Sequence, residues 1–456
     1  MICKMTAILL ALALVFCCGS FLSAKTATSG SEIIIATVDV ETPPEGALYK
    51  EAEAKLRNIP KDFNPDEAIK NGWQENQEME NVLSDNKEAI ELFKRATMQR
   101  NDGFIFGKKP AALNAATELP KYLDALKLFK LLLLEARRHE SKKQYSEAVS
   151  DYLAALRFMQ HVSQQRFGIM MANIINVINT NTIYPCLRDA VKNNGFSRQQ
   201  YQLLLDGLLS ISRKQDFLEA AFNEEREFGR GTLRMIEPEA KKGATFEQLF
   251  SFGPKSSVNH KKYAARLNRM LDAEFFGEFY KQIDVKSEDI FDNLIVAARN
   301  NRPEPCEKKF ADFRASLGSV EALEDSLLSA MGNSADSKES KLKIADIEAK
   351  IFLSVGIPQF TKIITRYHVF YNKFNTLTVA FAVKLYQMDN KVLPENLNQL
   401  VPKYLTIIPA DTFNDFKPLA YAEEGNYFSI SSKGAPKFEG DEKVQYDKGP
   451  IVFSLK

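Results

Sequence analysis

The residues best able to do chemistry are histidines, because an imidazole can act as a base or bind a metal near neutral pH. There are four of them: His139, His161, His260 and His368. His139 and His161 flank a predicted helical hairpin, so they are expected to approach each other, with Glu135 one turn from His139. A hydrolytic metal site needs three ligands in a fixed geometry, and the chain has no HExxH or comparable spacing. The pattern favours histidines at the surface or at the edge of the core, and it predicts no metal and no cofactor.

A second group of charged residues lies near the middle of the chain, where Glu224, Glu225 and Glu227 alternate with Arg226 and Arg230. Two arrangements fit this group. It can line a polar cleft, or it can form a solvated helix face with one buried carboxylate–arginine pair that fixes the register of packed helices. The second arrangement is favoured, with Glu225 and Arg226 as the structural candidates.

The chain lacks the usual catalytic signatures. It contains no GxSxG elbow, no P-loop, no Rossmann glycine fingerprint and no CxxC pair. Cys186 and Cys306 can pair in an oxidising compartment, or they can remain unpaired core residues. A non-enzymatic role is therefore favoured, and an envelope hydrolase with an unrecognised site remains an alternative.

The N-terminal segment predicts export. A short basic start and a long apolar run precede the small-residue site Leu22-Ser23-Ala24, which is typical of a secretory signal peptide over residues 1–24. Residues 25–46 are expected to form a flexible mature N-terminus. Three fates fit the first segment: cleavage, which is favoured, retention as a membrane anchor, or lipidation at Cys17 or Cys18. The expected location is periplasmic, membrane-anchored or extracellular.

Composition describes an ordinary globular chain. The 456 residues are 45% hydrophobic and 26% charged, with a formal net charge of +1. This balance does not favour nucleic acid or an anionic membrane surface as a partner. Any membrane contact is expected only through the N-terminal segment, and the expected partner is another envelope protein or a peptide.

Helical periodicity dominates residues 47–358, where apolar residues recur three and four apart. The clearest unit is a predicted helical hairpin at about 119–161. Its second helix carries the spacing of a tetratricopeptide unit, in which small alanines let the partner helix approach. The residues that form this pattern are Tyr145, Ala148, Tyr152 and Ala155. The first domain is therefore predicted to be multi-helical and solenoid-like.

Three further segments complete this region. Arg166 to Arg188 encloses an uncharged run, and its asparagines favour a buried central helix over a membrane span. The polar stretch from Gly318 to Glu339 is predicted to be a mobile surface loop. A helix break is expected at Gly356-Ile357-Pro358, because proline lacks the amide donor and disfavours helix just before it.

The C-terminal residues 359–456 predict a small α+β module. An apolar helix from Phe374 to Met388 is followed by a short helix from Glu395 to Leu400. Leu419–Ala422 and Tyr427–Ser431 alternate in period two around a Gly-Asn turn, which predicts an antiparallel hairpin. Gly449 to Leu455 is a candidate third strand.

This module resembles the globular head of type II secretion pseudopilins of the G type. The resemblance rests on a long helix, LP, a short helix, LVPKYL, IP-x-D-x-F and a strand pair that ends in S-x-x-G. Thr412 stands where these pseudopilins usually have proline, and Asp415 where they have glycine. The residues that carry the resemblance are Tyr386, Leu393, Pro394, Leu400, Pro402, Tyr404, Leu405, Pro409, Asp411, Phe413, Leu419, Tyr421, Tyr427 and Gly434.

Some pseudopilins of this type hold Ca²⁺ in a C-terminal loop, so the resemblance directs attention to the carboxylates in that region. They are Glu439, Asp441, Glu442 and Asp447. Calcium needs six to eight oxygens, and this segment is lysine-rich and loosely spaced, so these residues are weak candidates. Asp411 is expected to cap the turn after Pro409 instead.

Most of the chain beyond the N-terminal segment also resembles a group of uncharacterised exported planctomycete-type bacterial proteins. The stretches that carry this resemblance include NKEAIELFKRA, QYSEAVSDYLAALRFMQHVSQQ, FSRQQYQLLLDGL and NEEREF. The resemblance implies an architecture and a compartment but no activity. The expected function is a non-enzymatic exported helical scaffold or protein-interaction module, with a pilus or type II secretion component as the alternative.

Overall fold

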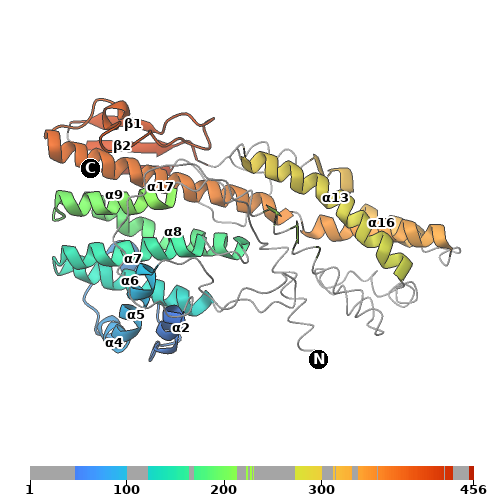
Figure 1. The fold of residues 1–456 in the computed structure, drawn as a ribbon, viewed down its shortest axis with the longest axis horizontal. Coiled ribbons are helices and arrows are strands. Elements are labelled where there is room, and N and C mark those ends of the chain that lie inside the picture. The colour runs from blue at the N-terminus through green and yellow to red at the C-terminus, as the bar shows by residue number, and fades with distance from the viewer. Residues whose placement is uncertain are drawn as a thin grey trace.

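The chain is mainly α-helical and ends in a small antiparallel sheet (Figure 1), as the sequence predicted. The computed structural model describes residues 47–99, 122–163, 169–212, 222–223, 226–227, 230, 273–299, 312–313, 315–330, 337–356, 358–425, 427–434 and 451–455. The signal-peptide segment 1–24 and the N-terminal segment 25–46 lie outside these residues.

The first four described helices build one end of the body. They are α2 (Ala47–Ala54), α3 (Asp66–Asn71), α4 (Gln77–Asp85) and α5 (Lys87–Met98). Asn76 caps the N-terminus of helix α4, and its side chain accepts hydrogen bonds from the backbone amides of Glu78 and Met79. Helix α5 buries the apolar stripe Ala89, Ile90, Phe93 and Ala96, which packs against α2 and α7.

Two helical hairpins follow. The predicted hairpin consists of α6 (Tyr122–Ser141) and α7 (Tyr145–Ser163), and the next one of α8 (Ile169–Lys192) and α9 (Arg198–Ser212). Helix α8 continues through Pro185. None of the helices in the described ranges is long and apolar enough to cross a membrane.

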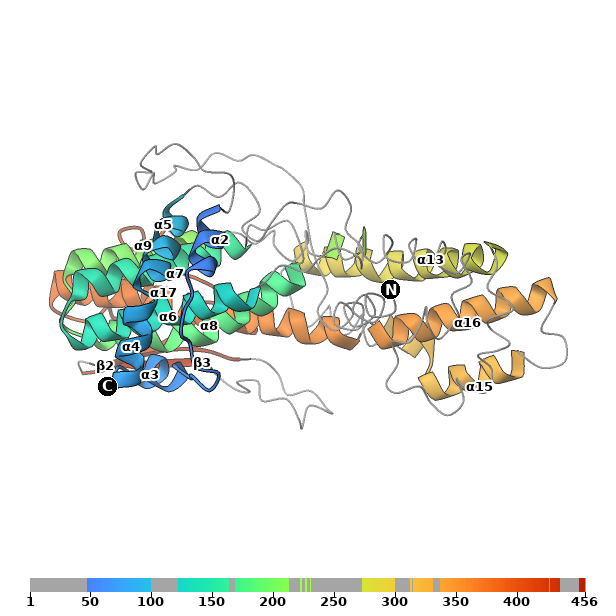
Figure 2. The ribbon, with the colours of Figure 1, turned by 90° about the horizontal axis from the view of Figure 1, so that it is seen from below.

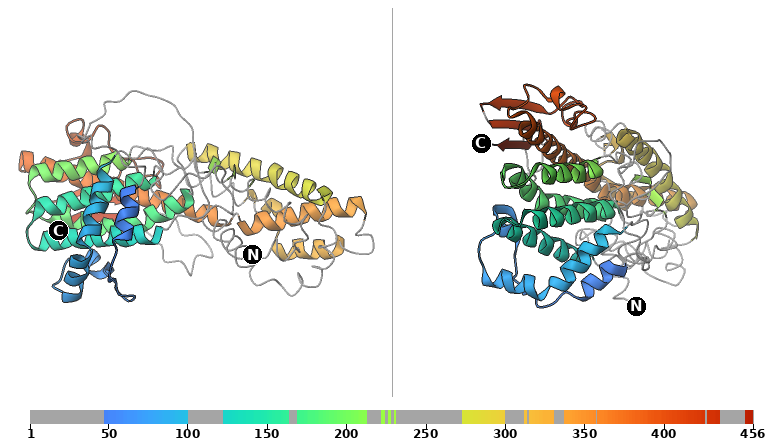
Figure 3. Two further views of the ribbon diagram at one scale, coloured as in Figure 1. Left: turned by 60° about the horizontal axis from the view of Figure 1, so that its bottom comes forward. Right: turned by 60° about the vertical axis from the view of Figure 1, so that its left-hand side comes forward.

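The helices form successive layers. Helices α5, α7, α9 and α17 (Pro358–Asn390) pack in that order, while α6 and α8 lie against α7 and against each other. Figure 1 and the right-hand view of Figure 3 show this order from α2 and α5 at one end to the sheet at the other. The sheet therefore occupies the place of a further helix and closes the stack.

Helix α17 continues beyond the stack toward a second group of helices (Figure 2). This group contains α13 (Ala273–Arg299), α15 (Val320–Ala330) and α16 (Lys338–Gly356), and α16 packs against both α13 and α15. We call these three helices the arm. The expected break is present, because α16 ends at Gly356 and α17 begins at Pro358. The predicted loop over Gly318–Glu339 is wrong, because Leu323 and Leu327 lie four residues apart and are buried in α15.

The sheet has the order β1 (Ala420–Glu424), β2 (Tyr427–Ser432), β3 (Ile451–Leu455), and both pairs are antiparallel. Its inner face places Phe428, Ile430 and Phe453 in the core against α17. The short predicted helix is the 3₁₀ turn Leu397–Leu400. Asp415, which stands where the resembling pseudopilins have glycine, has a φ of 50°, in the left-handed region that glycine adopts most easily.

Candidate functional site

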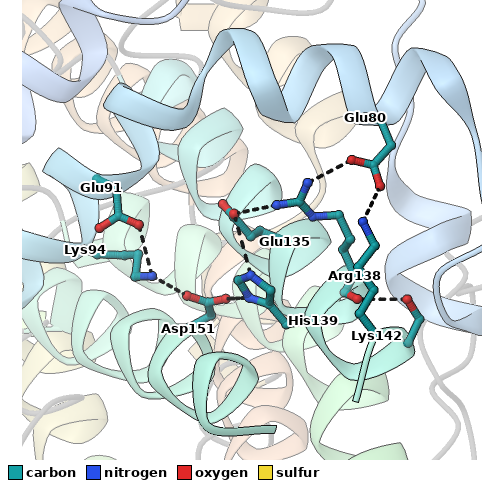
Figure 4. A network of polar contacts seen from close by, with 9 residues as sticks. Glu80, Glu91, Lys94, Glu135, Arg138, His139, Lys142 and Asp151 are labelled. Carbon is teal, nitrogen blue, oxygen red and sulfur yellow. Dashed lines mark hydrogen bonds and ion pairs between the residues drawn. The ribbon is translucent and has the colours of Figure 1, made fainter. Parts of the chain in front are cut away.

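A polar network joins α4, α5, α6 and α7 (Figure 4). At its centre, the fully buried carboxylate of Asp151 on α7 lies 2.7 Å from Lys94 Nζ and 2.8 Å from His139 Nδ1. Burial lowers the pKa of Lys94, but the charges and hydrogen bonds of Asp151 and Glu91 together outweigh burial and raise that pKa overall. Asp151 therefore holds one cation from α5 and one imidazole from α6.

The network extends to the surface along one side of α6. Arg138 bridges Glu135 at 3.0 Å and Glu80 of α4 at 2.8 Å, and Lys142 also contacts Glu80 at 2.9 Å. Burial raises the pKa of Glu135, and the nearby Asp151 charge raises it further. These contacts connect α4 to the hairpin of α6 and α7.

Many sites of nucleophilic catalysis contain an imidazole that is oriented by a buried aspartate. In such a site the second ring nitrogen faces a hydroxyl, a thiol or the substrate. Here, His139 Nε2 lies 4.0 Å from Glu135 Oε1, so the ring is held between two carboxylates. This arrangement is better suited to a structural ion pair that holds α6 against α7.

A second buried network surrounds Arg137 on the opposite side of α6. The guanidinium donates to Ile69 O, Glu140 Oε2 and Asp189 Oδ2 at 2.8, 3.0 and 2.7 Å. Tyr152 donates to the same Glu140 oxygen at 2.9 Å. One arginine on α6 thus connects to α3 and α8 directly, and to α7 through Glu140 and Tyr152.

The two hairpin histidines do not meet. His161 lies ten residues beyond Asp151, the partner of His139, which is about 15 Å along α7 at the helical rise per residue. His161 Nδ1 lies 2.7 Å from the Tyr49 hydroxyl, and burial lowers the pKa of His161 to about 4, with a further contribution from Arg157. The expectation that His139 and His161 approach each other was therefore wrong.

Of the remaining histidines and the metal candidates, only His368 lies among the described residues. His368 is buried between Tyr367 and Phe413, where desolvation lowers its pKa to about 3. Among the described residues, no three His, Cys, Asp or Glu side chains are placed to hold a metal. His260 and the calcium candidates Glu439, Asp441, Glu442 and Asp447 lie outside the described residues.

Asp411 is the centre of the contact between α17 and the C-terminal module. Its Oδ1 accepts hydrogen bonds from Asn372 Nδ2, the Phe413 amide and Ser432 Oγ at 3.1, 2.9 and 2.8 Å. Its Oδ2 accepts from the Lys433 amide at 2.7 Å. The capping role expected for Asp411 is present, and this carboxylate also connects the turn to α17 and to β2.

The other predicted residues have mainly packing roles. Ala148, Tyr152 and Ala155 are fully buried on α7, and Tyr145 packs against Phe196 with ring centroids 5.0 Å apart. The C-terminal residues differ in exposure: Pro394, Tyr404 and Phe413 are buried, Pro409 and Tyr421 are partly buried, and Tyr427 is exposed.

Arg226 pairs with the arm. Its guanidinium lies 3.1 Å from Asp292 and 3.6 Å from Glu288 of α13, while Arg230 contacts Glu288 at 2.8 Å. Glu225, the other candidate for a buried carboxylate–arginine pair, lies outside the described residues. The described carboxylate partners of Arg226 belong to α13 and are exposed, so they are not the buried carboxylate–arginine pair that the sequence predicted.

Cys186 is a buried, unpaired thiol whose pKa burial raises to about 12. Its Sγ lies 3.5 Å from the Ile69 carbonyl oxygen. Cys306 lies outside the described residues. The surroundings of Cys186 are those of an inert core cysteine.

Sequence patterns missed several buried charged residues, Asp151 and Arg137 among them. Lys373 and Lys384 of α17 donate to Asn181 and Asn194, at 3.0 and 2.8 Å, although these asparagines lie about 190 positions earlier in the chain. Glu348 of α16 is also buried. The apolar periodicity of α16 and α17 identifies the buried face, but not the polar side chains on it.

Comparisons of the chain with known protein families, with curated proteins and with solved structures found no match.

Proposed function

We propose that this chain is a non-enzymatic exported scaffold that binds another cell-envelope protein or a peptide. The observation that carries the proposal is the layered stack α5–α7–α9–α17, closed by the sheet. Stacked helical hairpins present extended surfaces that suit protein recognition. The export part of the proposal rests on the N-terminal sequence pattern alone.

The use of charged residues inside the stack supports the same proposal. The buried carboxylate Asp151 and the buried guanidinium of Arg137 both bind side chains or backbone groups of neighbouring helices. Such pairs fix how helices pack, because each charge would be costly to bury without its partner. They make the stack a defined surface for a partner.

The test is affinity capture from envelope fractions with the tagged full chain, after mild cross-linking in intact cells. The expected result is a reproducible partner protein that disappears when the helical stack is disrupted by Asp151→Ala. Glu339→Gln, an exposed change on α16, serves as the matched control and should retain the partner. Recovery of no specific protein with the parent chain would overturn the proposal.

A second candidate is a component of a secretion pilus that uses the C-terminal module for assembly. The observation that favours it is the long helix α17 packed on a three-stranded antiparallel sheet, together with the resemblance to pseudopilin heads. This function requires a retained N-terminal membrane segment and filaments. N-terminal sequencing of the protein from cells separates the two, because cleavage after Ala24 excludes the pilus component.

A further inference from the structure

Strand β1 is one of the two edge strands of the sheet, β3 being the other, and among the described residues its outer edge pairs with no strand. The order β1–β2–β3 pairs β1 only with β2. Four of its five residues are exposed, and Tyr421 is partly buried. Just before β1, Ala410 forms an isolated antiparallel bridge with Pro418; within the described part of the chain, the outer edge of β1 itself makes no backbone hydrogen bond.

The register identifies which backbone groups point outward. Glu424 pairs with Tyr427 across the two-residue turn, and in such a hairpin this closing pair is hydrogen-bonded. Because hydrogen-bonded and non-hydrogen-bonded pairs alternate along an antiparallel ladder, Ala422 and Ala420 also face β2. The N–H and C=O groups of Tyr421 and Glu423 therefore point away from the sheet.

The side chains along this edge define the chemistry of a partner. Glu423 and Glu424 are exposed on opposite faces of β1, and neither has an ion pair among the described residues. Tyr421 lies on the face toward α17 and packs against Phe428, at a centroid distance of 6.4 Å. An added strand would meet two carboxylates and one aromatic ring.

We propose that the β1 edge binds an extended segment of a partner protein in which basic and apolar side chains alternate. This inference rests on the proposed scaffold function and names how the partner is held. Main-chain hydrogen bonds to Tyr421 and Glu423 supply the pairing. The basic side chains lie on one face of the added strand and pair with Glu423, which shares that face with Tyr421, while the apolar side chains lie on the other face beside Ala420 and Ala422. A second copy of this chain fits poorly, because joining two β1 edges would bring four of these carboxylates together.

Charged side chains on edge strands also protect against aggregation. If the glutamates serve only to protect the edge, they repel other strands and the edge binds none. The two roles therefore differ in whether a basic extended peptide associates through its backbone.

The test measures binding of the fluorescein-labelled peptide Lys-Val-Lys-Val-Lys-Val to the full chain by fluorescence anisotropy. The controls are the same peptide N-methylated at alternate residues and the peptide Glu-Val-Glu-Val-Glu-Val. Glu423→Gln removes one charge, while Glu423→Pro also removes the outward N–H, which an edge strand tolerates. Glu395→Gln, an exposed glutamate away from the sheet edge, is the matched protein control.

We expect the Lys-Val peptide to bind, and the Glu-Val and N-methylated peptides to bind about tenfold more weakly. Glu423→Gln should weaken binding about threefold and Glu423→Pro about tenfold, while Glu395→Gln changes nothing. No binding of the Lys-Val peptide at millimolar concentration, or equal binding of its N-methylated form, would overturn the inference. If the parent and Glu423→Pro chains capture the same envelope partner equally, the edge inference fails and the scaffold stands.

Discussion

Glu348 should make the arm less stable as the pH rises. This α16 side chain is 5% exposed, and its Oε1 has no hydrogen-bond partner. Burial raises its pKa from 4.5 to about 8, with a further contribution from the charge of Glu324 on α15. The nearest ion pair on the same helix joins Asp346 to Lys286 of α13 and to Lys350, at 2.9 and 2.7 Å. Glu348 therefore stays protonated in the folded arm at a pH where the unfolded chain would ionise it.

The sign and size of this effect of pH on stability follow from proton linkage. Because the folded pKa of Glu348 is raised, its stabilising contribution is complete below pH 4.5 and is lost as the pH rises toward 8. The free energy of unfolding falls by about 1.4 kcal/mol per pH unit inside this window, or about 3 kcal/mol between pH 5 and 7.5. Glu348→Gln keeps the size and polarity of the side chain but cannot ionise, so the variant should not show this fall.

The assay is urea denaturation of the full chain and of Glu348→Gln at pH 5 and 7.5, with hydrogen exchange followed on α15 and α16. The difference in the free energy of unfolding between the two proteins reports the titration of Glu348 alone, because both proteins share every other titrating group. We expect the variant to be about 3 kcal/mol more stable than the parent at pH 7.5 and within about 1 kcal/mol at pH 5. Glu339→Gln on the exposed start of α16 is the control and should behave like the parent. A variant that loses as much stability between the two pH values as the parent does would refute the reasoning.

Three further predictions concern the stack and the C-terminal module. Gly195→Ala should cost about 1 kcal/mol in urea denaturation, because the new Cβ would clash with the Tyr145 ring; truncating Tyr145 to alanine should remove that cost. Asp411→Ala should cost about 3 kcal/mol, since it leaves four hydrogen-bond donors without their acceptor, and a loss below about 1 kcal/mol would contradict its central role. His368→Phe should remove part of the loss of stability in acid, because the pKa of His368 is lowered from 6.5 to about 3 and its contribution is lost as the pH falls through this range; an unchanged acid unfolding profile would contradict this.

Local patterns were sufficient to predict many elements. The spacing of Ala148, Tyr152 and Ala155 predicted which face of α7 is buried, because residues three and four apart lie on one side of a helix. Alternation around the Gly-Asn turn predicted the β1–β2 hairpin, and Pro358 predicted the break before α17. In each case the deciding interaction lies within a few residues of the signal.

Contacts between distant segments could not be predicted in this way. Asp151 reaches Lys94 on another helix, and Lys384 reaches Asn194, so neither pairing leaves a local pattern. The error over His139 and His161 has a related cause. An antiparallel hairpin brings together residues equally far from its turn, and His161 lies near the far end of α7.

The position of α17 bears on the choice between a scaffold and a pilus component. A helix that packs between subunits of a filament needs a free face along its length. Here α8 and α9 pack on α17, β2 and β3 also contact it, and the buried amines of Lys373 and Lys384 reach asparagines at 181 and 194. Opening that face for a neighbouring subunit would expose the core and separate these pairs. The layered stack therefore favours the scaffold function. A partner would have to bind at a surface that the stack does not bury, and the β1 edge is one such surface.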